Sequence, residues 1–188
     1  MAARQQPRQR GLNLGRPPRR FALDQNFPQP IIALLAEYLR EEAALIPLAR
    51  IDKRLAESVD DWRILLSLHQ RGDWDGLITT DSGMLSLPRE LAVLMQTKLS
   101  LVVAEEAGHD PLRATGLLLL HLPGICRDTT TSKPQVWRLR APGRRPGIDP
   151  WEELERVADH QSERAADLYA EAKLSRSVLQ LDPLDNTE

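Results

Sequence analysis

Short apolar runs alternate with helical patterns of apolar residues along most of this 188-residue chain. The apolar runs predict four buried strands and one edge strand, at 21–23, 45–48, 76–80, 99–104 and 135–139. Runs in which nearly every residue is apolar indicate strands covered on both faces, as in a parallel sheet wrapped by helices. We therefore predict an α/β fold, a three-layer α/β/α sandwich with a small, mainly parallel sheet and a C-terminal amphipathic helix.

Helical spacing appears between and after these strands. The first helix, expected over 28–42, is capped by Asn26 and carries one apolar stripe: Ile31, Leu34, Leu35, Tyr38 and Leu39. Later helices are expected from about 61 to 70, over 88–98, and from Asp110-Pro111 to a leucine-rich end closed by Pro123-Gly124. The last helix starts at Asp149-Pro150 and continues, with one apolar side, from Trp151 to Tyr169.

The chain divides into four predicted parts. Residues 1–18 form a flexible arm, because they are rich in Arg, Gln, Pro and Gly and have almost no apolar side chains to bury. Residues 19–140 form the α/β domain, 141–180 a basic loop and the C-terminal helix, and 181–188 a flexible tail.

Composition narrows the classes of function. The chain has 25 Lys and Arg against 27 Asp and Glu, a net charge of −2, which excludes a uniformly basic nucleic-acid coat protein. One cysteine, Cys126, excludes an intrachain disulfide framework and a multi-cysteine zinc site, so a reducing cytoplasm is expected. The most apolar stretch, 114–125, is much shorter than the roughly 20 residues of a membrane span, and the arginines of the arm are not followed by the apolar region of an export signal. We therefore expect no membrane association.

The candidate chemistry lies in carboxylates, because the sequence has no nucleophile elbow, phosphate-binding loop, dinucleotide fingerprint or zinc-binding H-E-x-x-H. Asp24 and Asp81 each follow a predicted parallel strand, the edge of a sheet where ligands gather. Asp61 shares a helical stripe with apolar residues, so its carboxylate is directed inward. Two alternatives stay open here: Ser58 and Asp61 form a capping box without any ligand, and Asp60 replaces Asp61 at the site.

Three converging aspartates repel one another, and a hard divalent cation is the usual means of holding them together. Oxygen donors suit Mg²⁺ or Mn²⁺ better than zinc. Such an ion activates water and neutralises charge on a phosphodiester. The aspartates are expected to act as metal ligands rather than as nucleophiles.

Three short motifs resemble compact PIN-like ribonuclease domains, over about residues 21–108. They are F-A-L-D-Q-N-F-P from Phe21, D-W-R-I-L from Asp61 and L-I-T-T-D-S-G-M-L from Leu77. The resemblance implies that Asp24, Asp61 and Asp81 are catalytic and hold Mg²⁺ or Mn²⁺. It implies that Asn26 orders the first loop, that Thr79 supplies a hydroxyl near the metal, and that the substrate is RNA. Many members of this family are toxins held inactive by an antitoxin protein.

The sequence also departs from the family pattern. Gln25 stands where many relatives have an acid, the motif at Asp81 lacks its second acid, and 72–75 form a small insertion. Fewer acids weaken a second metal site and lower the expected turnover. Glu105 and Glu106 are interpreted as solvated, with a fourth ligand as the alternative, and Trp62, Trp74 and Trp137 as candidate stacking faces for bases.

Two basic regions are candidate phosphate contacts: the arginine arm, and the loop with Arg140, Arg144 and Arg145. The main alternative function is a non-catalytic protein-interaction module, which pairs with a partner or forms a homodimer through the C-terminal helix. A receiver-like phosphoacceptor domain is a third hypothesis, disfavoured because Lys98 precedes the fourth strand rather than following a later one.

Overall fold

The computed structural model describes residues 17–25, 27, 29–108, 110–141 and 147–184. The arginine arm up to residue 16, the predicted cap Asn26 and the basic loop residues Arg144 and Arg145 therefore lie outside the described residues. In the part of the chain that is described, no helix combines the length and the apolarity of a membrane span.

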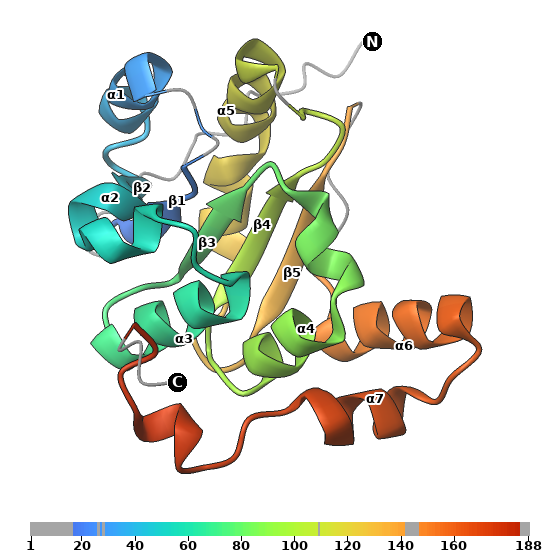
Figure 1. Ribbon diagram of the computed structural model, residues 1–188. Coiled ribbons are helices and arrows are strands. Elements are labelled where there is room, and N and C mark those ends of the chain that lie inside the picture. Colours follow the sequence, from blue (N-terminus) through green and yellow to red (C-terminus); the bar gives the residue numbers. More distant parts are fainter. Residues whose placement is uncertain (1–16, 26, 28, 109, 142–146, 185–188) are drawn as a thin grey trace, which may run out of the picture.

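The predicted fold class is confirmed: five parallel strands form one sheet between two layers of helices (Figure 1). The strands are β1 (Arg19–Leu23), β2 (Ala43–Pro47), β3 (Gly76–Thr79), β4 (Ser100–Ala104) and β5 (Gln135–Leu139). The described α-helices are α1 (Gln29–Tyr38), α2 (Leu48–Ile51), α3 (Asp61–Arg71), α4 (Pro88–Met95), α5 (Pro111–Asp128), α6 (Pro150–Gln161) and α7 (Ala165–Ala172). Short 3-10 turns are η1 (Lys53–Ala56), η2 (Ser82–Ser86) and η3 (Val178–Gln180).

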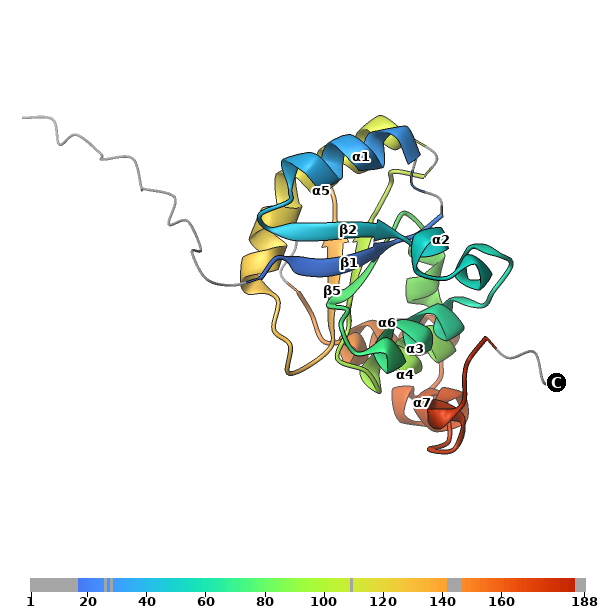
Figure 2. The same cartoon turned by 90° about the vertical axis from the view of Figure 1, so that its left-hand side faces the viewer.

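Each face of the sheet has its own apolar core, because successive strand residues point to opposite faces. In the view along the sheet, α1 and α5 cover one face, while α3, α4, α6 and α7 lie on the other (Figure 2). In β3, for example, Leu77 packs with α3 and α4, and Ile78 packs with the α1 and α5 side. Both side chains are at most 1% exposed, which explains why strands of this sheet appear as continuous apolar runs.

All five strands run in the same direction, but the order in which they are added across the sheet, β2-β1-β3-β4-β5, reverses between β1 and β3. The chain goes from β1 outward to β2, and then returns across β1 to β3 on the other side. The carboxyl ends of two strands at such a reversal leave a crevice where ligands bind in open α/β sheets. The register pairs Leu23 with Ile78, so the next residues, Asp24 and Thr79, meet at this edge.

Two helix predictions are wrong at their ends. The helix α5 continues through Pro123 to Asp128 instead of ending at Pro123-Gly124. A proline inside a helix removes one hydrogen bond, but the turns around it bury Leu122, Ile125 and Cys126, and this burial holds the helix together. The first helix ends at Tyr38, and its predicted stripe is rotated: Leu35 and Leu39 are buried, whereas Leu34 and Tyr38 are over 70% exposed.

The prediction of a single C-terminal helix is also wrong, because the structure has two helices there, α6 and α7. The break is at Ser162, whose backbone has φ 59°, in the left-handed region. Residues 161–164 are polar and exposed, so they offer no apolar side chains whose burial would favour a longer helix. The turn lets Leu168 of α7 join Leu154 of α6 in the core, and Trp151 meets Tyr169 edge to face at 5.9 Å. The apolar side of these helices, on which the homodimer hypothesis rested, packs within its own domain.

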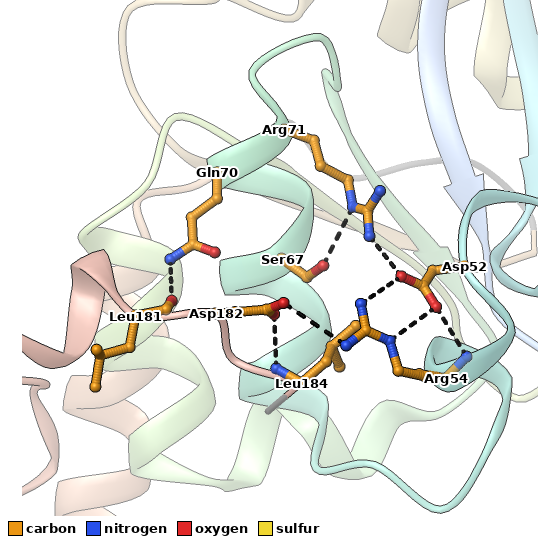
Figure 3. Close-up of polar contacts among 8 residues, drawn as sticks. All are labelled: Asp52, Arg54, Ser67, Gln70, Arg71, Leu181, Asp182 and Leu184. Atoms are coloured by element: carbon orange, nitrogen blue, oxygen red, sulfur yellow. Dashed lines mark hydrogen bonds and ion pairs between the residues drawn. The ribbon is translucent and has the colours of Figure 1, made fainter. Parts of the chain in front are cut away.

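The segment after α7 returns to α3, which carries Asp61 at its other end (Figure 3). The Gln70 amide donates to the carbonyl of Leu181 at 2.6 Å, and Leu184 is buried, so residues 181–184 contact the domain rather than forming a tail. Beside them, Asp52 accepts hydrogen bonds from Arg54 at 2.9 Å and Arg71 at 2.8 Å. Hydrogen bonding by Arg54, more than any other cause, lowers the pKa of Asp52 to about 2, which keeps this carboxylate charged.

Candidate active site

The Thr79 hydroxyl links the two predicted strand-end aspartates. It donates to Asp24 Oδ2 at 2.8 Å and accepts from the backbone N–H of Asp81 at 2.9 Å. Thr79 is fully buried, while Asp24 is partly exposed and Asp81 exposed. The buried hydroxyl therefore fixes the β1 and β3 ends relative to each other and leaves the carboxylates facing solvent.

The backbone around both aspartates is also ordered. The N–H of Asp24 donates to the Ile78 carbonyl at 3.0 Å, which extends the pairing of β1 with β3 by one bond. Asp81 Oδ1 accepts from the N–H of Gly83 at 2.7 Å and so caps the turn η2. A Cβ on Gly83 would stand 2.8 Å from the same oxygen, so glycine at 83 lets the carboxylate fold over this turn. The remaining oxygen of Asp81 is not used by this cap.

Asp61 is the first residue of α3, and the capping-box alternative is wrong. Asp60, not Ser58, stands at the N-cap, and it makes no side-chain capping hydrogen bond. The pKa of Asp61 is raised to about 6, first because burial disfavours the charged form. Repulsion from Asp24 and Asp81, and less from Asp60, raises it further. The structure thus brings the three predicted aspartates within electrostatic range, with Asp60 as a neighbour.

Glu90 is a fifth acidic residue in this region that sequence reasoning missed. It lies in the first turn of α4 and is 8% exposed. Burial, followed by the charges of Asp61 and Asp60, raises the pKa of Glu90 against the opposing effect of a hydrogen bond from its own backbone N–H. Its only signal in the sequence was an acid two residues after Pro88, a common feature of helix starts. Nothing local indicated that α4 packs beside α3.

The donor types in this region suit a hard divalent cation, since all are carboxylate or hydroxyl oxygens. Among the described residues, however, no group of three or more His, Cys, Asp or Glu side chains is placed to hold one ion. The aspartates are neighbours electrostatically without forming a complete coordination sphere. The residues present fit Mg²⁺ or Mn²⁺ by the chemistry of their oxygen donors.

Three other candidate residues have structural roles. Glu105, interpreted as solvated, is 4% exposed and forms ion pairs with Arg138 at 3.0 Å and with Arg140. Arg140 is thereby engaged with a carboxylate rather than displayed for phosphate, and the pairing raises its pKa. Trp137 is 2% exposed within β5 and offers no face to a base. Of the three tryptophans considered for stacking, Trp62 is the one beside the acidic region.

No protein-family model matches the chain, and comparison with curated proteins and with solved structures gives no match either.

Proposed function

We propose that the chain is a metal-dependent ribonuclease of PIN-like fold, acting in the cytoplasm on RNA phosphodiester bonds at the carboxyl ends of β1 and β3. The observation that supports it best is the bridge from Asp24 through the Thr79 hydroxyl to Asp81. Asp61 joins these two acids from the start of α3. Asp24 and Asp81 follow the two strands at the reversal of strand order, where α/β folds bind ligands, and Asp61 is close enough for both to raise its pKa.

In this proposal Asp24, Asp61 and Asp81 would hold Mg²⁺ or Mn²⁺, and the bound ion supplies an activated water and neutralises charge on the phosphate. The protein's own groups orient the acids. The Thr79 hydroxyl holds Asp24 Oδ2, and the Gly83 N–H holds Asp81 Oδ1, so both carboxylates are fixed before a ligand arrives. The pKa of Asp61 is raised, and a cation bound beside this carboxyl would favour its ionised form.

The test is cleavage of single-stranded RNA in Mn²⁺ by the wild-type protein, Asp81→Asn and Asp149→Asn. Asparagine keeps the oxygen that accepts from Gly83 and removes only the charge, so Asp81→Asn is expected to fold and lose activity by about 100-fold or more. Asp149→Asn is the matched control, because Asp149 caps α6 and asparagine caps equally well. Cleavage that persists in Asp81→Asn, or in EDTA, contradicts the proposed chemistry.

A second candidate is a non-catalytic interaction module, and a different face of the molecule favours it. The helices α1 and α5 leave large apolar side chains in solvent, with Leu34 73%, Tyr38 71%, Leu112 76% and Leu120 66% exposed. Exposed apolar patches are typical of protein interaction sites. Under this alternative, titration with Mn²⁺ gives neither binding heat nor thermal stabilisation, and RNA stays intact.

The resemblance extends the ribonuclease proposal to a toxin controlled by an antitoxin protein. Expression of the chain alone is then expected to stop bacterial growth, and Asp81→Asn is expected to restore it. Normal growth with active, folded wild-type protein contradicts the toxin role and leaves the ribonuclease proposal standing.

A further inference from the structure

A pair of arginines shares one tryptophan beside the acidic region. The guanidinium of Arg63 lies 5.1 Å from the centre of the Trp62 ring, and that of Arg89 lies 5.9 Å from it. Arg63 and Trp62 belong to the first turn of α3, and Arg89 to the first turn of α4, the helix packed next to it (Figure 1). Cation–π contact with one ring holds two flexible side chains near a common place.

Both guanidinium groups keep hydrogen-bond donors for an incoming acceptor. Arg89 is exposed and forms no ion pair with any described carboxylate within 4 Å. The nearest carboxylate of Arg63 is Asp60, whose Oδ2 is 3.6 Å from Nε, which is too long for a hydrogen bond. This differs from Arg138 and Arg140, whose ion pairs are short and partly buried. Trp62 therefore orients both arginines, Arg63 forms one loose ion pair with Asp60, and neither guanidinium makes a side-chain hydrogen bond to another described residue.

The two arginines and Trp62 lie next to acidic residues, which is where an RNA substrate would need cations. Trp62 directly follows Asp61, and Arg89 directly precedes Glu90. Acidic side chains repel a phosphate chain, so a nuclease built on them needs cations close by to hold the substrate. Guanidinium groups bind phosphate oxygens through two parallel hydrogen bonds. A partly exposed aromatic ring and guanidinium planes also stack on bases that are not paired.

We propose that Arg63 and Arg89, held over Trp62, form a binding subsite for single-stranded RNA, which takes a phosphate and base next to the bond that is cut. This inference rests on the proposed function for the site it serves. It adds the residues that bind the substrate and the form of the substrate, an unpaired strand. A duplex keeps its bases stacked and gives Trp62 nothing to contact.

The test measures binding apart from cleavage. A short fluorescent single-stranded RNA is titrated with the Asp81→Asn protein in Mn²⁺, at several salt concentrations between about 50 and 200 mM. Arg63→Gln with Arg89→Gln is added to this background. Each lost phosphate contact lowers the salt slope by about 0.7 and affinity by about fourfold near 0.15 M salt, so the pair is expected to weaken binding roughly 15-fold.

The matched control is Arg40→Gln. Arg40 is exposed and pairs with Glu37 after α1, far along the chain from either helix start, and its loss is expected to leave affinity unchanged. Arg89→Gln alone is measured as well, because Arg89 is exposed and this change is expected to leave the fold intact even if the double variant misfolds. The same sequence as duplex RNA is expected to bind more weakly than the single strand, with no effect of the arginine changes beyond that of Arg40→Gln.

The outcomes separate the two proposals. Binding that the arginine variants do not weaken overturns this inference, whether or not the wild-type protein cleaves RNA. Binding that depends on Arg63 and Arg89 without any cleavage by the wild type supports a single-stranded RNA subsite at these residues but contradicts the ribonuclease proposal and, with it, a place for the subsite beside a cut bond. If the protein neither binds nor cleaves single-stranded RNA, both are overturned.

Discussion

Replacing Asp61 by Asn is expected to stabilise the protein while removing its proposed activity. Burial and the neighbouring acids raise the pKa of this carboxyl from 3.8 to about 6. At about 1.4 kcal/mol for each pKa unit, the ionised carboxylate destabilises the fold by at most roughly 3 kcal/mol. Asp61 is partly exposed, and solvent screening reduces this energy, so we expect a gain of about 1–2 kcal/mol in the free energy of unfolding at neutral pH.

The sign follows from proton binding. The native state holds the Asp61 proton more tightly than the unfolded state, so stability falls as pH rises from about 4 to about 6 and is lowest above that window. Asparagine carries no charge at any pH. The variant and the wild type are therefore expected to differ little near pH 4 and to differ most above pH 6, with the variant more stable.

The assay is urea unfolding followed by tryptophan fluorescence in EDTA, at several pH values across this window. Asp60→Asn is the control, because Asp60 is exposed and makes no capping hydrogen bond, so it is expected to change stability by less than about 1 kcal/mol. An Asp61→Asn protein that is no more stable than wild type above pH 6 refutes the reasoning. In Mn²⁺ the difference in stability between the variant and the wild type is expected to narrow or change sign, because an ion that binds only the wild-type acids stabilises only the wild type.

Two further predictions concern the fold that supports the site. Arg19 is 5% exposed and donates to Asp75 at 2.5 Å and to the Thr129 carbonyl at 2.6 Å. Arg19→Met is therefore expected to lower the free energy of unfolding by about 3–5 kcal/mol, because it leaves the buried partners unpaired. The control Arg40→Met, on the surface, is expected to lower it by less than about 1 kcal/mol, and urea unfolding measures both. A Cβ at Gly76 would stand 2.0 Å from the Ser100 carbonyl oxygen, so Gly76→Ala is expected to lower the melting temperature and to cost about 3 kcal/mol or more. Gly116→Ala, at an open helical position, is expected to raise it slightly, and equal effects of the two would contradict this reading of the sheet.

The strands could be predicted because burial on both faces leaves a local signature. All five residues of β4 are buried, and the sequence shows them as one run of small and apolar residues. Two helix boundaries were predicted closely because a local group decides each. The helix expected to end near residue 70 ends before Gly72, which has φ 81°, and the helix expected to start at Asp110 is capped by this residue, which accepts from two backbone N–H groups. These contacts lie within a few residues along the chain, so the sequence contains them.

Predictions failed where distant packing outweighs a local preference. Pro123 is a local stop signal, yet the residues on both sides of it pack against the sheet, and α5 continues. No glycine in the sequence indicates the turn at Ser162, because the contact between α6 and α7 determines where the chain turns. The buried acid Glu90 was missed for the same reason, since only the packing of α4 on α3 brings it near Asp61.

The relation between Asp24 and Asp81 depends on strand register rather than on either residue alone. Leu23 pairs with Ile78, which places Thr79 beside Asp24 and lets one hydroxyl serve both acids. A shift of β3 by one residue would turn Thr79 to the other side of the sheet and put Leu77 and Ile78 on the wrong faces. The two apolar cores oppose that shift, because each receives alternate residues of β3. The hydrophobic pattern that sets the register of the sheet therefore also sets the contact between Asp24, Thr79 and Asp81, although neither strand-end motif alone predicts this contact.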